Sequence, residues 1–118
     1  AHPHVPQDVC TMRDGPSGRN IPVIYSMGNL VSNMSVPNSQ VGLGVRLRFS
    51  IDPEGEKSML QPEYILTWCS RPGGFSDNFS VIPIKDYLGK EQLWKDALDY
   101  ANMKESYEMI KEECKIND

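Results

Sequence analysis

Residues 43–51, LGVRLRFSI, carry the clearest structural signal in this chain. Apolar side chains fall at every second position, with glycine, arginine and serine between them. Successive side chains of a β-strand point to opposite faces of a sheet, so this alternation predicts a strand with one apolar and one polar face. The sequence DPEG at residues 52–55 follows directly and contains the proline and glycine that tight turns use. The chain should therefore return in a second strand over residues 64–69.

Shorter runs of the same kind lie on both sides of this hairpin. Strands are predicted over residues 9–12, 21–27 and 79–84. Turn residues at 14–18 and 72–74 make connections of hairpin length, so neighbouring strands should be antiparallel. Residues 32–40, rich in serine, asparagine and proline, should form a long loop.

The composition changes after Asp86. Residues 90–101 and 103–115 are rich in helix-forming residues, and their apolar side chains recur at helical spacing. Asn102 and Glu105 form a capping pair that would separate two helices.

These patterns together predict an α+β fold, a mostly antiparallel β-sheet with C-terminal helices. We expect a single domain or partial domain, with a strand-rich part at residues 1–88 and a helical tail at residues 89–118.

The composition excludes several classes of protein. A net charge of −4 and a pI near 5.1 leave no basic surplus for general binding to nucleic acid. No run approaches the roughly 20 apolar residues that cross a bilayer. The odd number of widely spaced cysteines, Cys10, Cys69 and Cys114, is untypical of a disulfide framework or a zinc ribbon. We expect Cys69 and Cys114 to be small packing residues.

The two histidines, His2 and His4, flank Pro3 near the start of the chain. On a strand their side chains would point in opposite directions, but on a tight loop both could converge on a metal centre. Imidazole is a common ligand of zinc and also suits iron, nickel and copper. From the spacing alone, the pair fits either solvated side chains or metal ligands.

Other polar residues near these histidines also have two interpretations. Ser26, Gly28 and Asn29 could place a hydroxyl and an amide beside a metal centre, or could simply build a turn that requires a positive φ. Asp8 could orient an imidazole through its second nitrogen, or could be a solvated acid.

Two motifs in series resemble a known family. AHPHVPQ at residues 1–7 and VIYSMGNL at residues 23–30 resemble the "GAHPHV.Q … YSLGNF" pair of CapA-type proteins, which act in bacterial capsule (poly-γ-glutamate) synthesis. The resemblance extends to VIPIKDY at residues 81–87 and so covers most of residues 1–88. Met27 and Leu30 depart from the family's leucine and phenylalanine, and the glycine before Ala1 is absent.

The resemblance implies a metal-dependent site. The family is similar to calcineurin-like metallophosphoesterases, which layer helices outside two facing sheets in an α/β/β/α sandwich and hold a dinuclear centre of divalent metals such as manganese, iron or zinc. His2 and His4 match the last ligand motif and would bind metal, whereas the other ligands would precede Ala1. This chain would then be the C-terminal part of a longer protein, inactive when isolated.

The resemblance also implies a location and partners. It places the protein in the bacterial cell envelope, outside the cytoplasm, with a phosphoester or an anionic envelope polymer as substrate. The missing N-terminal part would be its first partner, and an isolated chain with uncovered apolar surface should self-associate or be unstable. The alternative is a non-catalytic envelope module that assembles or anchors polymer. Arg46 and Arg48 could contact such a polymer, although exposed strand arginines usually serve solubility.

Overall fold

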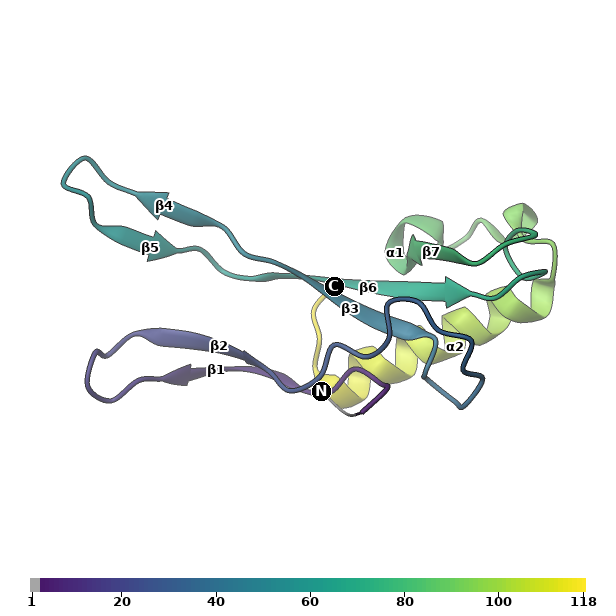
Figure 1. Ribbon diagram of the computed structural model, residues 1–118, viewed down its shortest axis with the longest axis horizontal. Coiled ribbons are helices and arrows are strands. Elements are labelled where there is room, and N and C mark those ends of the chain that lie inside the picture. The colour runs from purple at the N-terminus through teal and green to yellow at the C-terminus, as the bar shows by residue number, and fades with distance from the viewer. Residues whose placement is uncertain (1–2) are drawn as a thin grey trace.

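Figure 1 shows a computed structural model of the chain, which describes residues 3–118. All of its strand pairs are antiparallel, and a long helix closes the chain, so the predicted α+β class is confirmed. The elements in chain order are β1 (Val9–Arg13), β2 (Asn20–Ile24), β3 (Val41–Arg46), β4 (Phe49–Ile51), β5 (Lys57–Met59), β6 (Glu63–Ser70), β7 (Ser80–Pro83), α1 (Ile84–Tyr87), the 3-10 turn η1 (Glu91–Leu93) and α2 (Ala97–Cys114).

The body of the molecule is a three-stranded sheet covered on one face by α2. The strand order is β3-β6-β7, and α2 runs along the sheet (Figure 1). Leu43 lies opposite Leu66, and Trp68 lies between Val41 and Ile82 on the neighbouring strands. All five side chains are buried because alternate positions of each strand face the helix.

Helix α2 buries one stripe of side chains against this sheet. The stripe consists of Tyr100, Met103, Tyr107, Ile110 and Cys114, at spacings of three and four residues. Within residues 3–118 no helix combines the length and the apolar character needed to cross a membrane.

The predicted break between two C-terminal helices is wrong. The helix is continuous through Asn102, and its N-cap is Asp96, whose carboxylate accepts a hydrogen bond from the backbone N–H of Leu98. The aspartate precedes the long run of helix formers and caps its first turn, so no cap is needed at Asn102.

Two β-hairpins project from the body as arms. The first arm (residues 9–24) contains β1 and β2, and the second arm (residues 47–62) contains β4 and β5 (Figure 1). They make the molecule 53 Å long and raise its radius of gyration to 16.8 Å, against about 13.5 Å expected for a compact chain of this length.

The prediction of one strand over residues 43–51 is wrong, because β3 ends at Arg46 and residues 49–51 form β4 in the second arm. The strand breaks at Leu47 and Arg48, and its apolar alternation continues into β4, where Phe49 and Ile51 are 69% and 66% exposed. Beyond the break the chain has left the body, so within residues 3–118 no element covers that apolar face.

Candidate functional site

Residues 25–28 form a turn and belong to the second motif, VIYSMGNL at residues 23–30. This segment continues β2 and lies between two other segments. Met27 bridges Pro6 on one side, and its carbonyl accepts a hydrogen bond from the Leu43 N–H at 2.8 Å on the other. Gly28 then bridges Gly42 of β3. The turn is therefore fixed between the histidine-bearing segment and the central sheet.

Gly28 has a structural reason to be glycine. Its φ of +68° lies in the left-handed region, and a Cβ added there would lie 2.7 Å from the Val41 carbonyl oxygen and 2.8 Å from Cδ of Pro6. A side chain would therefore be both strained and in collision with its neighbours. The glycine allows the turn to approach the N-terminal segment closely.

Ser26 connects the turn to the segment that carries His4. The residue is buried, and its hydroxyl donates to the Pro3 carbonyl at 3.2 Å and accepts from the Gly28 N–H at the same distance. Its hydrogen is thus engaged with a backbone oxygen next to the histidine. Ser26 thus holds in place the loop that carries His4, called the histidine loop below.

Asn29 contacts His4 directly, although 25 residues separate them. The Oδ1 atom of Asn29 lies 2.9 Å from Nδ1 of His4. The Nδ2 atom of Asn29 donates to the Ser39 carbonyl at 3.1 Å and approaches the sulfur of Met34 at 3.4 Å. The structure thus brings together His4, Ser26, Gly28 and Asn29, four of the residues singled out from the sequence. His2 lies outside the described residues.

Asp8 lies at another place. It lines a shallow cleft of about 510 Å³ with Glu113 and Cys114 at the end of α2. Burial, followed by the charges of Asp8 and Glu113, raises the pKa of the Cys114 thiol. Asp8 was interpreted either as a partner of an imidazole or as a solvated acid, and the structure places the Asn29 amide against the His4 ring.

Ser39 was not identified from the sequence. The group that matters is its backbone carbonyl, which every residue possesses, so no residue pattern marks it. The residue is 1% exposed, in the loop predicted at residues 32–40. Only the folding of this loop over the turn reveals its contact with Asn29.

The described residues do not by themselves form a metal site. Within residues 3–118 no group of three or more histidine, cysteine, aspartate or glutamate side chains could hold a metal ion. His4 itself has suitable chemistry, because metal-binding histidines usually engage their other ring nitrogen in a hydrogen bond of this kind. A complete site would need ligands beyond those described.

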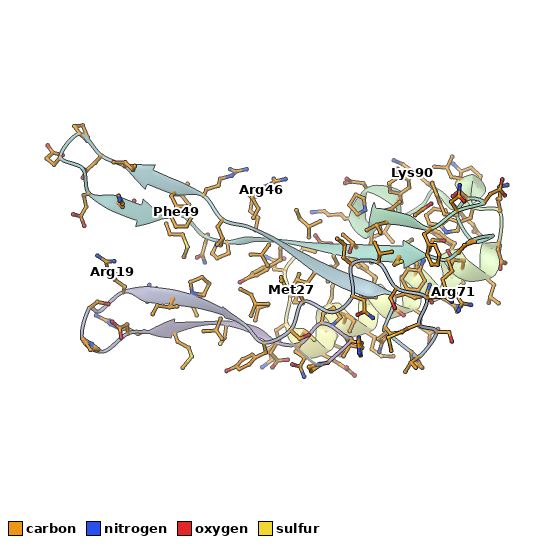
Figure 2. All side chains as sticks on the ribbon, in the orientation of Figure 1. Arg19, Met27, Arg46, Phe49, Arg71 and Lys90 are labelled. Atoms are coloured by element: carbon orange, nitrogen blue, oxygen red, sulfur yellow. The ribbon has the colours of Figure 1, made fainter. Side chains whose placement is uncertain are left out.

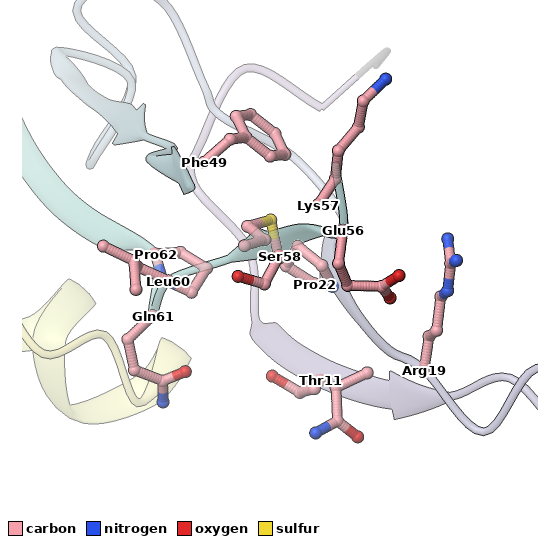
Figure 3. Close-up of a pocket in the computed structure, with 12 residues that line it drawn as sticks. Thr11, Arg19, Pro22, Phe49, Glu56, Lys57, Ser58, Leu60, Gln61 and Pro62 are labelled. Carbon is pink, nitrogen blue, oxygen red and sulfur yellow. The ribbon is translucent and has the colours of Figure 1, made fainter. Parts of the chain in front are cut away.

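The two arms enclose a concavity of about 550 Å³. Thr11, Arg19 and Pro22 line it from the first arm, and Phe49 and Glu56 face them from the second (Figure 3). Figure 2 shows Arg19 and Phe49 on the facing sides of the arms, with Met27 where the arms join the body.

The arginines considered for contact with an anionic polymer lie at the base of the second arm. Arg46 and Arg48 both form ion pairs with Glu63, at 3.0 and 3.1 Å. This shared carboxylate offsets part of their positive charge, which weakens their attraction for a polyanion.

These contacts hold the loop that carries His4 against the turn of residues 26–29, called the SxGN turn below. Comparison of the chain with protein-family models, with characterised proteins and with solved structures finds no match.

Proposed function

We propose that this chain is the C-terminal part of a CapA-type capsule (poly-γ-glutamate) biosynthesis protein, and that the complete protein is a metal-dependent hydrolase of the bacterial cell envelope. In this proposal His2 and His4 bind metal. The remaining ligands, and the second sheet of an α/β/β/α sandwich, come from the segment before Ala1.

The single observation that carries the proposal is the contact between His4 and Asn29. These residues belong to the two motifs on which the family resemblance rests, and they lie 2.9 Å apart. A histidine that was merely solvated near a chain end would have no need of a fixed amide partner, whereas a metal ligand requires a fixed ring orientation.

The turn residues would serve that orientation. Ser26 holds the carbonyl of Pro3, next to His4, and Gly28 allows the turn to approach Pro6. When bound, a pair of divalent metals such as manganese, iron or zinc would activate a water molecule and neutralise the oxygens of a phosphoester or a similar anionic substrate in the envelope. The protein's own part is to present the imidazoles in a rigid loop.

The test uses a longer protein that restores the segment before Ala1, together with its His2→Ala and His4→Ala variants. The measurements are bound metal per chain and hydrolysis of a generic phosphodiester. We expect the unmodified protein to retain metal and each substitution to reduce both metal content and hydrolysis at least tenfold.

A longer protein that binds no metal with both histidines intact would contradict the proposal. The function would then be that of a non-catalytic envelope module that assembles or anchors polymer. Ser32→Ala supplies a control, because this residue lies in the adjoining loop and, among residues 3–118, its side chain bonds only to the Met34 N–H.

We also propose that the missing N-terminal part covers the apolar faces of the arms. Phe49, Ile51 and Leu60 of the second arm, and Met12 and Ile21 of the first, are about half exposed or more. Apolar surface of this extent favours association. In the isolated chain the same surface leads to self-association.

A further inference from the structure

The amide of Asn29 lies between two groups with fixed hydrogen-bonding roles. On one side is the carbonyl oxygen of Ser39, which can only accept a hydrogen bond. The amide nitrogen of Asn29 must therefore face Ser39, which leaves its oxygen facing His4. That oxygen can also only accept, so the Nδ1 atom of His4 must carry the hydrogen of the 2.9 Å contact.

We infer that Asn29 is a positioning residue that holds the neutral His4 ring in its Nδ1–H tautomer. The lone pair of the ring then resides on Nε2. This nitrogen is the one that would bind metal in the proposed function.

The chain of hydrogen bonds from Ser39 through Asn29 to His4, called the relay below, is anchored at Ser39 and at the backbone of Asn29. Ser39 is buried, and its backbone N–H and hydroxyl both bond to the Val36 carbonyl, at 3.0 and 2.5 Å. The backbone of Asn29 presses against β3, since a Cβ added at Gly42 would lie 2.5 Å from the Asn29 carbonyl oxygen. The amide therefore has little freedom to rotate and exchange its two ends.

The relay explains why an amide occupies this position. Asparagine has a donor for Ser39 and an acceptor for His4 on the same planar group. An aspartate would accept from His4 equally well, but its second oxygen would face the Ser39 carbonyl, and the two acceptors would repel each other. The chemistry of the pair thus selects asparagine over the carboxylate that often supports metal-bound histidine.

The tautomer can be measured without metal. A neutral histidine free in water prefers the Nε2–H tautomer, so the relay requires the opposite of the solution preference. Only the identity of the metal-binding nitrogen rests on the proposed function. The tautomer itself rests on the contacts of Asn29 alone.

The experiment records the ¹⁵N spectrum of the His4 ring in the 118-residue chain, at about pH 8.5, where an ordinary histidine is neutral. His2→Ala in all samples makes His4 the sole imidazole. Asn29→Ala and Asn29→Ser test the relay. Asn33→Ala is the matched control, because Asn33 is exposed in the same loop region.

We expect the Nδ1–H tautomer to dominate with Asn29 present and with Asn33→Ala, and the Nε2–H tautomer to dominate in both Asn29 variants. An Nε2–H tautomer with Asn29 intact would overturn the inference, as would an unchanged Nδ1–H tautomer in either folded Asn29 variant. If Asn29→Ala does not fold, Asn29→Ser decides.

A second measurement tests the metal-binding consequence in the longer protein. With Zn²⁺ as the probe, Asn29→Ala should weaken binding about 10- to 100-fold, whereas Asn33→Ala should leave it unchanged. Equal Zn²⁺ affinity in the two variants would overturn the positioning role. Absence of Zn²⁺ binding in the unmodified protein would contradict the proposed function but leave the tautomer result standing.

Discussion

The indole N–H of Trp68, in the central strand β6, donates a hydrogen bond of 3.2 Å to Oδ2 of Asp99, in the first turn of α2. The same oxygen accepts from the Trp94 indole at 3.1 Å and from the Ser70 hydroxyl at 2.7 Å. Gly74 packs against this cluster, since a Cβ there would lie 2.7 Å from Asp99 Oδ2. One carboxylate therefore joins the sheet, the helix and the segment between them.

Replacing Asp99 should weaken the fold more than any other exposed or half-buried acid. Asp99→Ala would leave two buried indole N–H groups and a buried hydroxyl without their acceptor, and each such group costs about 1–3 kcal/mol. We expect a loss of about 4 kcal/mol in the free energy of unfolding, measured by urea denaturation. Asp96→Ala is the control, because it removes only a helix cap and should cost about 1 kcal/mol. Equal losses in the two variants would contradict the role of the cluster.

Gly28 and Gly55 form a matched pair for measuring the tight approach at the turn. Both have positive φ, of 68° and 82°, but an added Cβ meets Val41 and Pro6 at Gly28, whereas at Gly55 it meets no atom of residues 3–118 within 4 Å. Gly55→Ala should therefore cost only the backbone strain, about 1 kcal/mol. Gly28→Ala should cost about 3 kcal/mol, because the collision is added to that strain.

Thermal or urea unfolding measures the difference between the two glycine variants. If Gly28→Ala lowers the free energy of unfolding no more than Gly55→Ala does, the N-terminal segment moves away from the added methyl group without an energetic penalty. The SxGN turn would then not hold the histidine loop.

The free energy of unfolding should fall in alkali because of the ionisation of Tyr107. Burial, followed by the charge and hydrogen bond of Asp118 and the charge of Glu108, raises the pKa of Tyr107 from 10.0 to about 12. Between these pH values the unfolded chain loses the phenolic proton while the folded chain keeps it. The stabilisation is complete below pH 10 and disappears as the pH rises towards 12, a loss of about 2 kcal/mol.

Urea denaturation at about pH 8 and pH 11.5 measures this dependence. Tyr107→Phe should remove it, whereas Tyr25→Phe should retain it, because Tyr25 is 55% exposed. An identical alkaline loss in the Tyr107→Phe chain would assign the effect to other groups.

Self-association, if the arms cause it, should respond to Phe49. This side chain is 69% exposed on the second arm, and Leu98, on α2, has a similar exposure of 64%. Phe49→Ser should shift the light-scattering mass of a concentrated solution towards that of the monomer, whereas Leu98→Ser should not. A monodisperse monomer for the unmodified chain at high concentration would contradict the proposal.

Local patterns in the sequence were sufficient for the class of the fold. Alternation over residues 43–51, with a returning strand over residues 64–69, predicted the pairing of β3 with β6, because a strand exposes and buries every second residue. The helical spacing of apolar residues over residues 103–115 predicted in the same way a buried face of α2, which contains Tyr107, Ile110 and Cys114. The motifs also singled out Ser26, Gly28 and Asn29 as companions of the histidines.

The tertiary structure decided where those patterns stop and which polar groups meet. Alternation continues to Ile51 although the strand breaks at Leu47, because a residue pattern does not record whether a second surface is present to cover it. The contacts of Asn29 with His4 and Ser39, and of Asp99 with Trp68, join residues 10 to 31 positions apart, one of them through a backbone carbonyl. The sequence by itself determined strand and helix periodicity, whereas hydrogen bonds over such separations arise only when packing brings the segments together.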